Sequence, residues 1–181
     1  MMENNKTNSS NSENNKITRK QFLRKLWWGA LGVLGLQAVA ATVVSLNPKV
    51  AEGSFGSKVN IATVDEVRAM PVGTVAYFSE QRLYISRLEG GILAIYRKCP
   101  HLGCVVPWVS DEASEDDIAE KGRFNCPCHG GIYDRYGLVR AGPPPRPLDI
   151  FPIEIDGENI VVDTGTIIQR EKFEESQLIK V

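Results

Sequence analysis

The chain has 181 residues, which is enough for one ordinary folded domain with appendages but not for two domains of average size. Hydrophobic residues make up 43% of it and charged residues 24%, a balance that excludes wholesale disorder and a protein with many membrane spans. The formal net charge of −1 argues against nucleic acid as a partner. All four cysteines and both histidines lie between Cys99 and His129, so the candidate functional site is expected there.

The N-terminal region predicts a tail followed by a membrane anchor. Residues 1–25 hold few apolar side chains and end in a cluster of Lys and Arg, so we expect a disordered, basic tail in the cytoplasm. Residues 26–46 are uncharged, and about 20 apolar residues suffice for a helix to cross a membrane. The basic flank places the N-terminus inside a bacterial cytoplasmic membrane and the rest of the chain on its outer, periplasmic or lumenal, side.

Two features of this segment concern export. Residues 18–25 resemble the twin-arginine signal with Lys20 as the second basic residue, but ordinary positive-inside topology explains them equally well. Ala38-Val39-Ala40 matches a signal-peptidase pattern. Because the apolar run continues to Leu46, we favour a single uncleaved anchor.

A folded β domain is expected after a linker. Residues 47–58 mix Pro, Gly and Ser without periodicity and predict a flexible tether. Residues 59–165 hold short runs rich in Val, Ile, Tyr and Phe, separated by turn signals such as Asp156-Gly157. We expect strands at 75–78, 83–86, 92–96, 148–155 and 160–163, and one or two helical turns at 64–70. Closely spaced short strands favour an all-β fold, a small antiparallel sandwich or barrel.

Two further segments carry weaker signals. Residues 110–120 contain six carboxylates, and we expect a short exposed helix or an acidic loop whose charges face solvent. Residues 166–181 form a C-terminal extension in which apolar and charged residues alternate without a clear end. No functional site is assigned to either segment.

Two short boxes carry the chemistry. The first is Cys99-Pro100-His101-Leu102-Gly103-Cys104, and the second is Cys126-Pro127-Cys128-His129-Gly130-Gly131. Two thiolates and two imidazoles at such spacing could bind zinc tetrahedrally, which would leave two cysteines for a disulfide in an exported domain. The pattern by itself does not exclude this Cys2His2 zinc site.

The pattern C-x-H-x-G-C followed by C-P-C-H-G resembles the signature of the Rieske iron–sulfur family. The resemblance implies one [2Fe-2S] cluster per chain, held by the loops of a small antiparallel Rieske-type β-sandwich that follows one N-terminal transmembrane helix. It implies that Cys99 and Cys126 ligate one iron and that His101 and His129 ligate the other. It also implies a disulfide between Cys104 and Cys128.

The resemblance extends to three supporting features beyond the ligands. Tyr133 matches the family tyrosine whose hydroxyl bonds a ligand sulfur. Residues 141–147, AGPPPRP, resemble the proline loop that shields the cluster in quinol-oxidising members. Residues 104–108, CVVPW, are similar to the b6f and Gram-positive side of the family.

The favoured function is the Rieske subunit of a cytochrome bc1- or b6f-type complex. It would take one electron from membrane quinol held by cytochrome b or b6 and pass it to a c-type cytochrome. His129 is the expected quinol contact and proton acceptor, and His101 is the other exposed ligand. The alternatives are the small Rieske subunit of a periplasmic molybdenum oxidase such as arsenite oxidase, and a soluble ferredoxin-type carrier, whose relatives lack the anchor and the two additional cysteines.

Gly131 suggests which quinol is oxidised. This position is often serine in high-potential members of the family, where the hydroxyl bonds a bridging sulfide, and Gly131 has no hydroxyl. A hydrogen bond to a charged acceptor contributes ~1.5 to 3 kcal/mol, so its loss lowers the potential by up to ~65 to 130 mV. A lower potential favours menaquinol over ubiquinol or plastoquinol.

Overall fold

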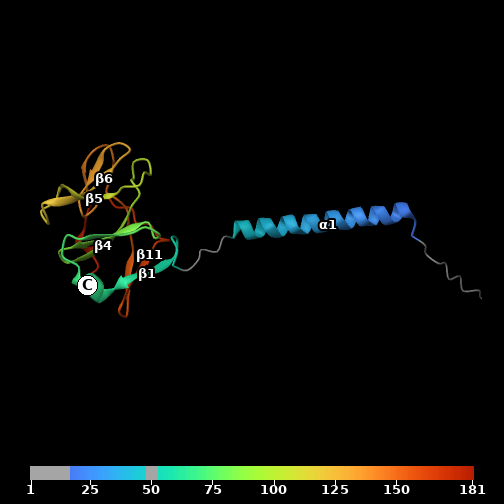
Figure 1. Cartoon of the computed structure of the whole chain (residues 1–181), viewed down its shortest axis with the longest axis horizontal. Coiled ribbons are helices and arrows are strands. Elements are labelled where there is room, and N and C mark those ends of the chain that lie inside the picture. The colour runs from blue at the N-terminus through green and yellow to red at the C-terminus, as the bar shows by residue number, and fades with distance from the viewer. Residues whose placement is uncertain (1–16, 48–52) are drawn as a thin grey trace, which may run out of the picture. The chain divides into compact units, whose positions relative to one another are not determined.

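The computed structural model describes residues 17–47 and 53–181, which belong to two separate compact units, residues 1–49 and 50–181 (Figure 1). The predicted disordered tail, up to residue 16, lies outside the described residues, as does the part of the predicted tether at residues 48–52. The first unit is described by one helix, and the second contains all of the strands.

The helix α1 (Arg19–Leu46) is long and apolar enough to cross a membrane. It begins before the predicted anchor, because Thr18 caps it: the Gln21 backbone N–H donates to Thr18 Oγ1 at 3.3 Å, and the Thr18 N–H donates to Gln21 Oε1 at 3.1 Å. Arg19, Lys20, Arg24 and Lys25, which belong to the predicted tail, therefore lie on the first two turns of the helix.

The second unit is built from three antiparallel sheets, as the all-β prediction requires. The first has the order β1 (Lys58–Thr63), β11 (Asn159–Asp163), β10 (Ile153–Asp156). The second has the order β2 (Val75–Phe78), β3 (Leu83–Leu88), β4 (Gly91–Tyr96), β9 (Ile150–Phe151). The third has the order β5 (Trp108–Ala113), β6 (Lys121–Cys126), β7 (Gly131–Tyr133), β8 (Val139–Ala141).

Strand β4 of the second sheet separates two hydrophobic cores. Its alternating side chains Ile92, Ala94 and Tyr96 belong to the core shared with β1 and β11. Leu93 and Ile95 belong to the core shared with β6 and β7. Figure 1 shows the resulting layers, with β4 between β1 and β11 on one side and β5 and β6 on the other. Because both faces are covered, β4 is buried along its whole length.

Two helical elements complete the unit. The predicted helical turns at 64–70 are present as α2 (Val64–Ala69), which Thr63 caps through a reciprocal pair of hydrogen bonds with Glu66. A short 3-10 helix, η1 (Glu175–Gln177), lies in the C-terminal extension.

The predicted strand at 148–155 is wrong as a single element. Residues 150–151 form β9 beside β4, whereas residues 153–156 form β10 beside β11, in a different sheet. Pro152 lies between them and has no N–H to continue a ladder, so the chain passes from one sheet to the other at this residue.

The prediction of a helix or an acidic loop at 110–120 is also wrong for its first part, because β5 continues to Ala113 and pairs with β6. In the rest of the segment Glu115, Asp117 and Glu120 are exposed, as predicted for a solvated face, but Asp116 is an exception. Asp116 forms an ion pair of 2.7 Å with Arg135, and both side chains are almost fully buried. Arg135 also stacks on Trp108, with its guanidinium carbon 5.2 Å from the ring centroid, so the segment is fastened to the domain.

Both ends of the second unit pack against its sheets. In the described part of the predicted tether, the Phe55 ring stacks on Tyr96 at 5.7 Å and the Gly56 N–H donates to Thr164 Oγ1 at 2.8 Å. In the C-terminal extension, Ile168 and Ile179 form β-bridges with Ile150 and Ile92, respectively. Residues 53–57 and the extension are therefore parts of the folded unit.

Candidate metal centre

The two boxes fold as equivalent turns. The Cys99 carbonyl accepts a hydrogen bond of 2.9 Å from the Gly103 N–H, and the Cys126 carbonyl accepts one of 3.1 Å from the Gly130 N–H. Both glycines have positive φ, +82° and +69°, which a side chain would strain. Each turn therefore starts with a cysteine and closes at a glycine four residues later.

A disulfide between Cys104 and Cys128 ties the two turns together, as predicted. The sulfurs of these two residues and of Cys126 lie within 4.8 Å of one another, a grouping that by distance alone suits a metal ion. The disulfide rules out this set, because neither bonded sulfur is a thiolate. Cys99 and Cys126 remain as free thiols.

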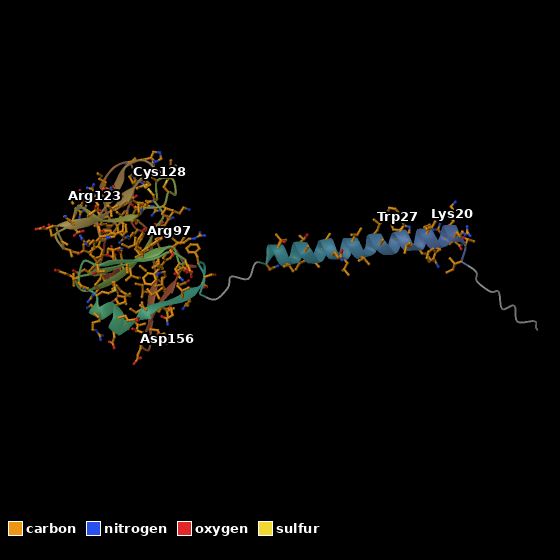
Figure 2. All side chains as sticks on the ribbon, viewed as in Figure 1. Lys20, Trp27, Arg97, Arg123, Cys128 and Asp156 are labelled. Atoms are coloured by element: carbon orange, nitrogen blue, oxygen red, sulfur yellow. A yellow bond between two sulfur atoms is a disulfide. The ribbon has the colours of Figure 1, made fainter. Side chains whose placement is uncertain are left out.

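The free thiols are buried, whereas the histidines lie at the surface. Cys99 and Cys126 are each 3% exposed. His129 is exposed and His101 half-buried, and their ring centroids lie 4.8 Å apart. Each turn thus contributes one inner sulfur and one outer imidazole, which brings all four predicted ligands to one end of the domain. Figure 2 shows Cys128 at this end and Asp156 at the opposite end.

Several donors surround the buried sulfurs. The Tyr133 hydroxyl lies 3.1 Å from Cys99 Sγ, and burial followed by the contact with Cys99 raises the pKa of this tyrosine, so the hydroxyl keeps its proton. Burial also raises the pKa of Cys126, while hydrogen bonds from the backbone N–H groups of Cys128 and His129 oppose that shift. Such donors stabilise charge on a sulfur and suit a pair of metal-bound thiolates.

A third loop covers the second turn. A Cβ atom built on Gly131 would lie 2.7 Å from Pro144 Cγ, and one built on Gly142 would lie 2.8 Å from the Gly130 carbonyl oxygen. Pro144 is buried at this contact, within the predicted proline loop at 141–147. The loop therefore covers Gly131, which is buried, on the side of the second turn next to Cys126.

The donor set fits an iron–sulfur centre of mixed ligation. Two buried thiols suit one iron, two adjacent imidazoles suit a second, and the hydroxyl and amide donors around the sulfurs complete the surroundings. Comparison with known proteins supports this fit, because the model of the family described as "Rieske [2Fe-2S] domain" matches residues 57–152, more than half of the chain. The chain belongs to the Rieske [2Fe-2S] family.

The Rieske relatives include subunits of membrane complexes. The cytochrome b6-f complex iron-sulfur subunit of Chlorobaculum tepidum is 30% identical over 146 residues, which are 80% of this chain and 74% of that protein. The subunit of the same name from Synechococcus sp. strain JA-2-3B'a(2-13) is 28% identical over 163 residues, which are 83% of this chain and 90% of the relative.

Two solved structures are also similar. A chain of a hyperthermophilic respiratory Complex III is 31% identical, with a TM-score of 0.43 over 75% of this chain and 98% of that one. The plasma membrane Rieske protein PetC3 of Synechocystis PCC 6803 is 29% identical, with a TM-score of 0.40 over 57% of this chain and 97% of that one.

Membership of the Rieske family decides between the cofactors that the spacing left open. The cofactor is a Rieske-type [2Fe-2S] cluster and the chain is an electron-transfer protein, so the zinc alternative is dropped. Helix α1, the one described helix that is long and apolar enough to cross a membrane, and the relatives named as cytochrome b6-f complex subunits together indicate a single-pass membrane anchor.

Sequence analysis missed one charged pair near the predicted ligands. Arg146, inside the proline loop, forms an ion pair with Asp149, and both residues line a cavity of about 400 Å³ together with Cys99 and His101. An arginine within AGPPPRP was a signal for this pair, but only the fold shows that the loop runs beside the first turn.

Proposed function

We propose that this Rieske protein is the iron–sulfur subunit of a cytochrome bc- or b6f-type complex and carries one electron from membrane quinol to a c-type cytochrome. The observation that carries the proposal is the arrangement of the boxes, with two thiols buried and two imidazoles at the surface. The names of the relatives, cytochrome b6-f complex iron-sulfur subunits, support the same role and imply a cytochrome b or b6 partner.

The proposed ligands are Cys99 and Cys126 for one iron and His101 and His129 for the other. Bound in this way, the cluster supplies one-electron redox chemistry. Cys104 and Cys128 hold the two turns in register through their disulfide. The Tyr133 hydroxyl donates a hydrogen bond to the Cys99 sulfur, and Pro144 excludes water above Gly131.

The histidines are the groups that meet the quinol. His129 is the more exposed of the two, and the ring nitrogen that it does not use as a ligand is free to accept a proton. A quinol must lose a proton with each electron, so we assign His129 as the quinol contact and proton acceptor. His101 is the second exposed imidazole at this end of the domain.

The membrane topology follows from the charges on α1. Lys and Arg occupy its first two turns and none lies in its last turn, which supports a cytoplasmic N-terminus and a Rieske domain on the outer side of a bacterial membrane. We expect the linker predicted from the sequence between the anchor and the domain to allow one domain to serve two partners, cytochrome b or b6 and a c-type cytochrome. The subunit is thus one part of a quinol–cytochrome c oxidoreductase and not an enzyme alone.

Menaquinol is the proposed donor, because Gly131 offers no hydroxyl to stabilise the reduced state and a lower potential matches a lower-potential quinol. The contact of Gly131 with Pro144 supplies a second reason for glycine at this position. The two reasons are compatible, and the substitutions Gly131→Ala and Gly131→Ser distinguish them.

The ligand set is tested by His101→Ala and His129→Ala in the full-length chain, with Leu102→Ala as the control. Leu102 is 70% exposed and lies between the ligands of the first turn, so its loss should leave the spectrum intact. Each histidine variant should lose the cluster, because an iron without a ligand is open to water. A full visible spectrum in either variant removes that histidine from the ligand set.

The quinol-oxidising role is tested by purifying the tagged chain from membranes. We expect cytochrome b and a c-type cytochrome to co-purify, and the complex to reduce the cytochrome with menaquinol analogues. Co-purification with a molybdenum-containing subunit and no cytochrome b would overturn the proposal in favour of the oxidase alternative.

A further inference from the structure

An ion pair joins Arg146 of the proline loop to Asp149, which follows the loop in the chain. The Arg146 guanidinium faces the Asp149 carboxylate, with Nη2 3.3 Å from Oδ2 and Nη1 in contact with Oδ1. The side chains are only 18% and 10% exposed. The hydrogen bond with Asp149 raises the pKa of Arg146, so the guanidinium stays charged.

The pair lies beside the proposed ligands. Arg146 and Asp149 line a cavity of about 400 Å³ that also contacts Cys99 and His101, and residues of the C-terminal extension form part of its wall. The charges of the pair therefore act on the residues around the Cys99 sulfur.

Electrostatics gives the two charges opposite effects on an electron carrier. Reduction adds one negative charge to the site, which a nearby cation stabilises and a nearby anion destabilises. Partly buried charges act through an effective dielectric well below that of water, and salt screens them less than it screens exposed charges. We propose that Arg146 and Asp149 are an opposed charge pair that sets the midpoint potential, with Arg146 raising it and Asp149 restraining that rise.

This inference rests on the proposed ligand set, since it needs the cluster to lie against Cys99 and His101. A purely structural role of the pair would predict different signs for the shifts in midpoint potential. If the pair merely held the proline loop, loss of either partner would loosen the same loop and move the potential in the same direction. Opposed charges require shifts of opposite sign.

The backbone allows the carboxylate to be changed with little disturbance. The Asp149 carbonyl accepts a 2.8 Å hydrogen bond from the Tyr96 N–H, which joins this loop to β4 and does not involve the side chain. Asp149→Asn keeps this bond and nearly the same volume. Arg146→Gln removes the cation, and Arg146→Lys keeps the charge while losing the paired contact.

The test is a redox titration of the full-length protein in membranes, followed by electron paramagnetic resonance (EPR). We expect Arg146→Gln to lower the equilibrium constant for reduction between about twofold and tenfold, where tenfold corresponds to 59 mV for one electron. Asp149→Asn should raise it by a similar factor, and the double variant should lie near the wild type. Arg146→Lys should stay nearer the wild type than Arg146→Gln does.

The control is Glu154→Gln, which removes one carboxylate from an exposed ion pair with Lys58. Glu154 lies on β10 with Asp156, at the end of the domain opposite to Cys128 (Figure 2). Its potential should match the wild type. Shifts of the same sign in Arg146→Gln and Asp149→Asn, or shifts no larger than the control, overturn the inference. If Arg146→Gln does not accumulate, an unchanged or lowered potential in Asp149→Asn overturns it.

An incorrect ligand set would be recognised from the EPR spectrum of the wild type. The wild-type EPR spectrum would then have the average g value of a cluster ligated only by cysteine, whatever the charge variants do. A histidine-type spectrum with unshifted potentials would overturn the charge-pair inference and leave the proposed function intact.

Discussion

Gly131 and Pro144 are in contact so close that no other residue fits at position 131 without movement: a Cβ atom on Gly131 would lie 2.7 Å from Pro144 Cγ. Real Cβ atoms essentially never come within 3.0 Å of another heavy atom. The glycine that follows the second box is thus required by the proline loop that covers it. The absence of a hydroxyl at this position has a packing cause as well as a redox consequence.

Two substitutions separate these effects. Gly131→Ala and Gly131→Ser both bring a Cβ atom against Pro144, so we expect each to lower the free energy of unfolding by ~1 to 3 kcal/mol. Only Gly131→Ser adds a hydroxyl, so the midpoint potential of the cluster should be higher in this variant than in Gly131→Ala. Thermal unfolding and EPR redox titration measure the two effects. A midpoint potential in Gly131→Ser that is equal to or below that in Gly131→Ala would remove the reason for proposing menaquinol as the donor.

The steric contact between position 131 and Pro144 can be tested separately. Pro144→Ala removes the ring atoms that the new Cβ meets. In the Gly131→Ala background it should therefore recover part of the lost stability. If the double variant is less stable than Gly131→Ala by the full cost of Pro144→Ala alone, the two residues are not coupled and the packing cause is wrong.

Tyr133→Phe should lower the potential while leaving the cluster in place. The hydroxyl is 3.1 Å from Cys99 Sγ and stabilises the charge that accumulates on this sulfur in the reduced state. Loss of one such bond costs about 1 kcal/mol, or roughly 40 mV for one electron. The matched control is Tyr136→Phe, whose ring packs on Phe173 at 4.7 Å. An equal shift in both variants would contradict a specific role for Tyr133.

Removing the disulfide should loosen the centre. The bond joins Cys104 and Cys128, 24 residues apart, and for a loop of this length the loss of the cross-link lowers the free energy of unfolding by ~3 kcal/mol. The double variant Cys104→Ser/Cys128→Ser should therefore unfold at a lower temperature and lose its cluster more readily. Alkylation of the unfolded, unreduced wild type should label two of the four cysteines, and labelling of all four would show that the bond is absent in the protein.

Arg170→Met should destabilise the domain although the residue lies in the C-terminal extension. Burial lowers the pKa of Arg170 to about 10, and its guanidinium donates to the carbonyls of Leu148, at 2.8 Å, and Tyr136. Methionine leaves both buried carbonyls without this donor, at a cost of ~1 to 3 kcal/mol for each.

Urea denaturation measures that loss. Lys172→Met is the matched control, because Lys172 is exposed and its ion pair with Glu174, at 3.1 Å, lies at the surface. A surface pair contributes ~0 to 1 kcal/mol, so the control should unfold near the wild-type midpoint. Equal effects of the two substitutions would mean that the buried contacts of Arg170 do not hold the extension.

The amino-acid sequence by itself determined the class of protein and the identity of its boxes. A cluster site needs a few ligands of fixed chemistry at fixed spacing, and Cys99–Cys104 and Cys126–Gly131 hold them within two turns, so local sequence was sufficient. The disulfide pair followed from the family resemblance, whereas closely spaced short strands were sufficient to predict the all-β fold. Hydropathy alone was sufficient for the anchor, because a membrane span depends on composition along one helix.

Only the tertiary structure decided how distant segments meet. Pro144 against Gly131, Arg146 with Asp149 beside Cys99, and the buried contacts of the C-terminal extension all depend on where the loops lie. The pair Arg135–Asp116 fastens the acidic segment to the interior through one buried carboxylate, where charge composition predicted that all of its carboxylates face solvent. Local periodicity reports one residue's neighbours along the chain, whereas these contacts arise when three sheets stack and bury groups from separate loops together.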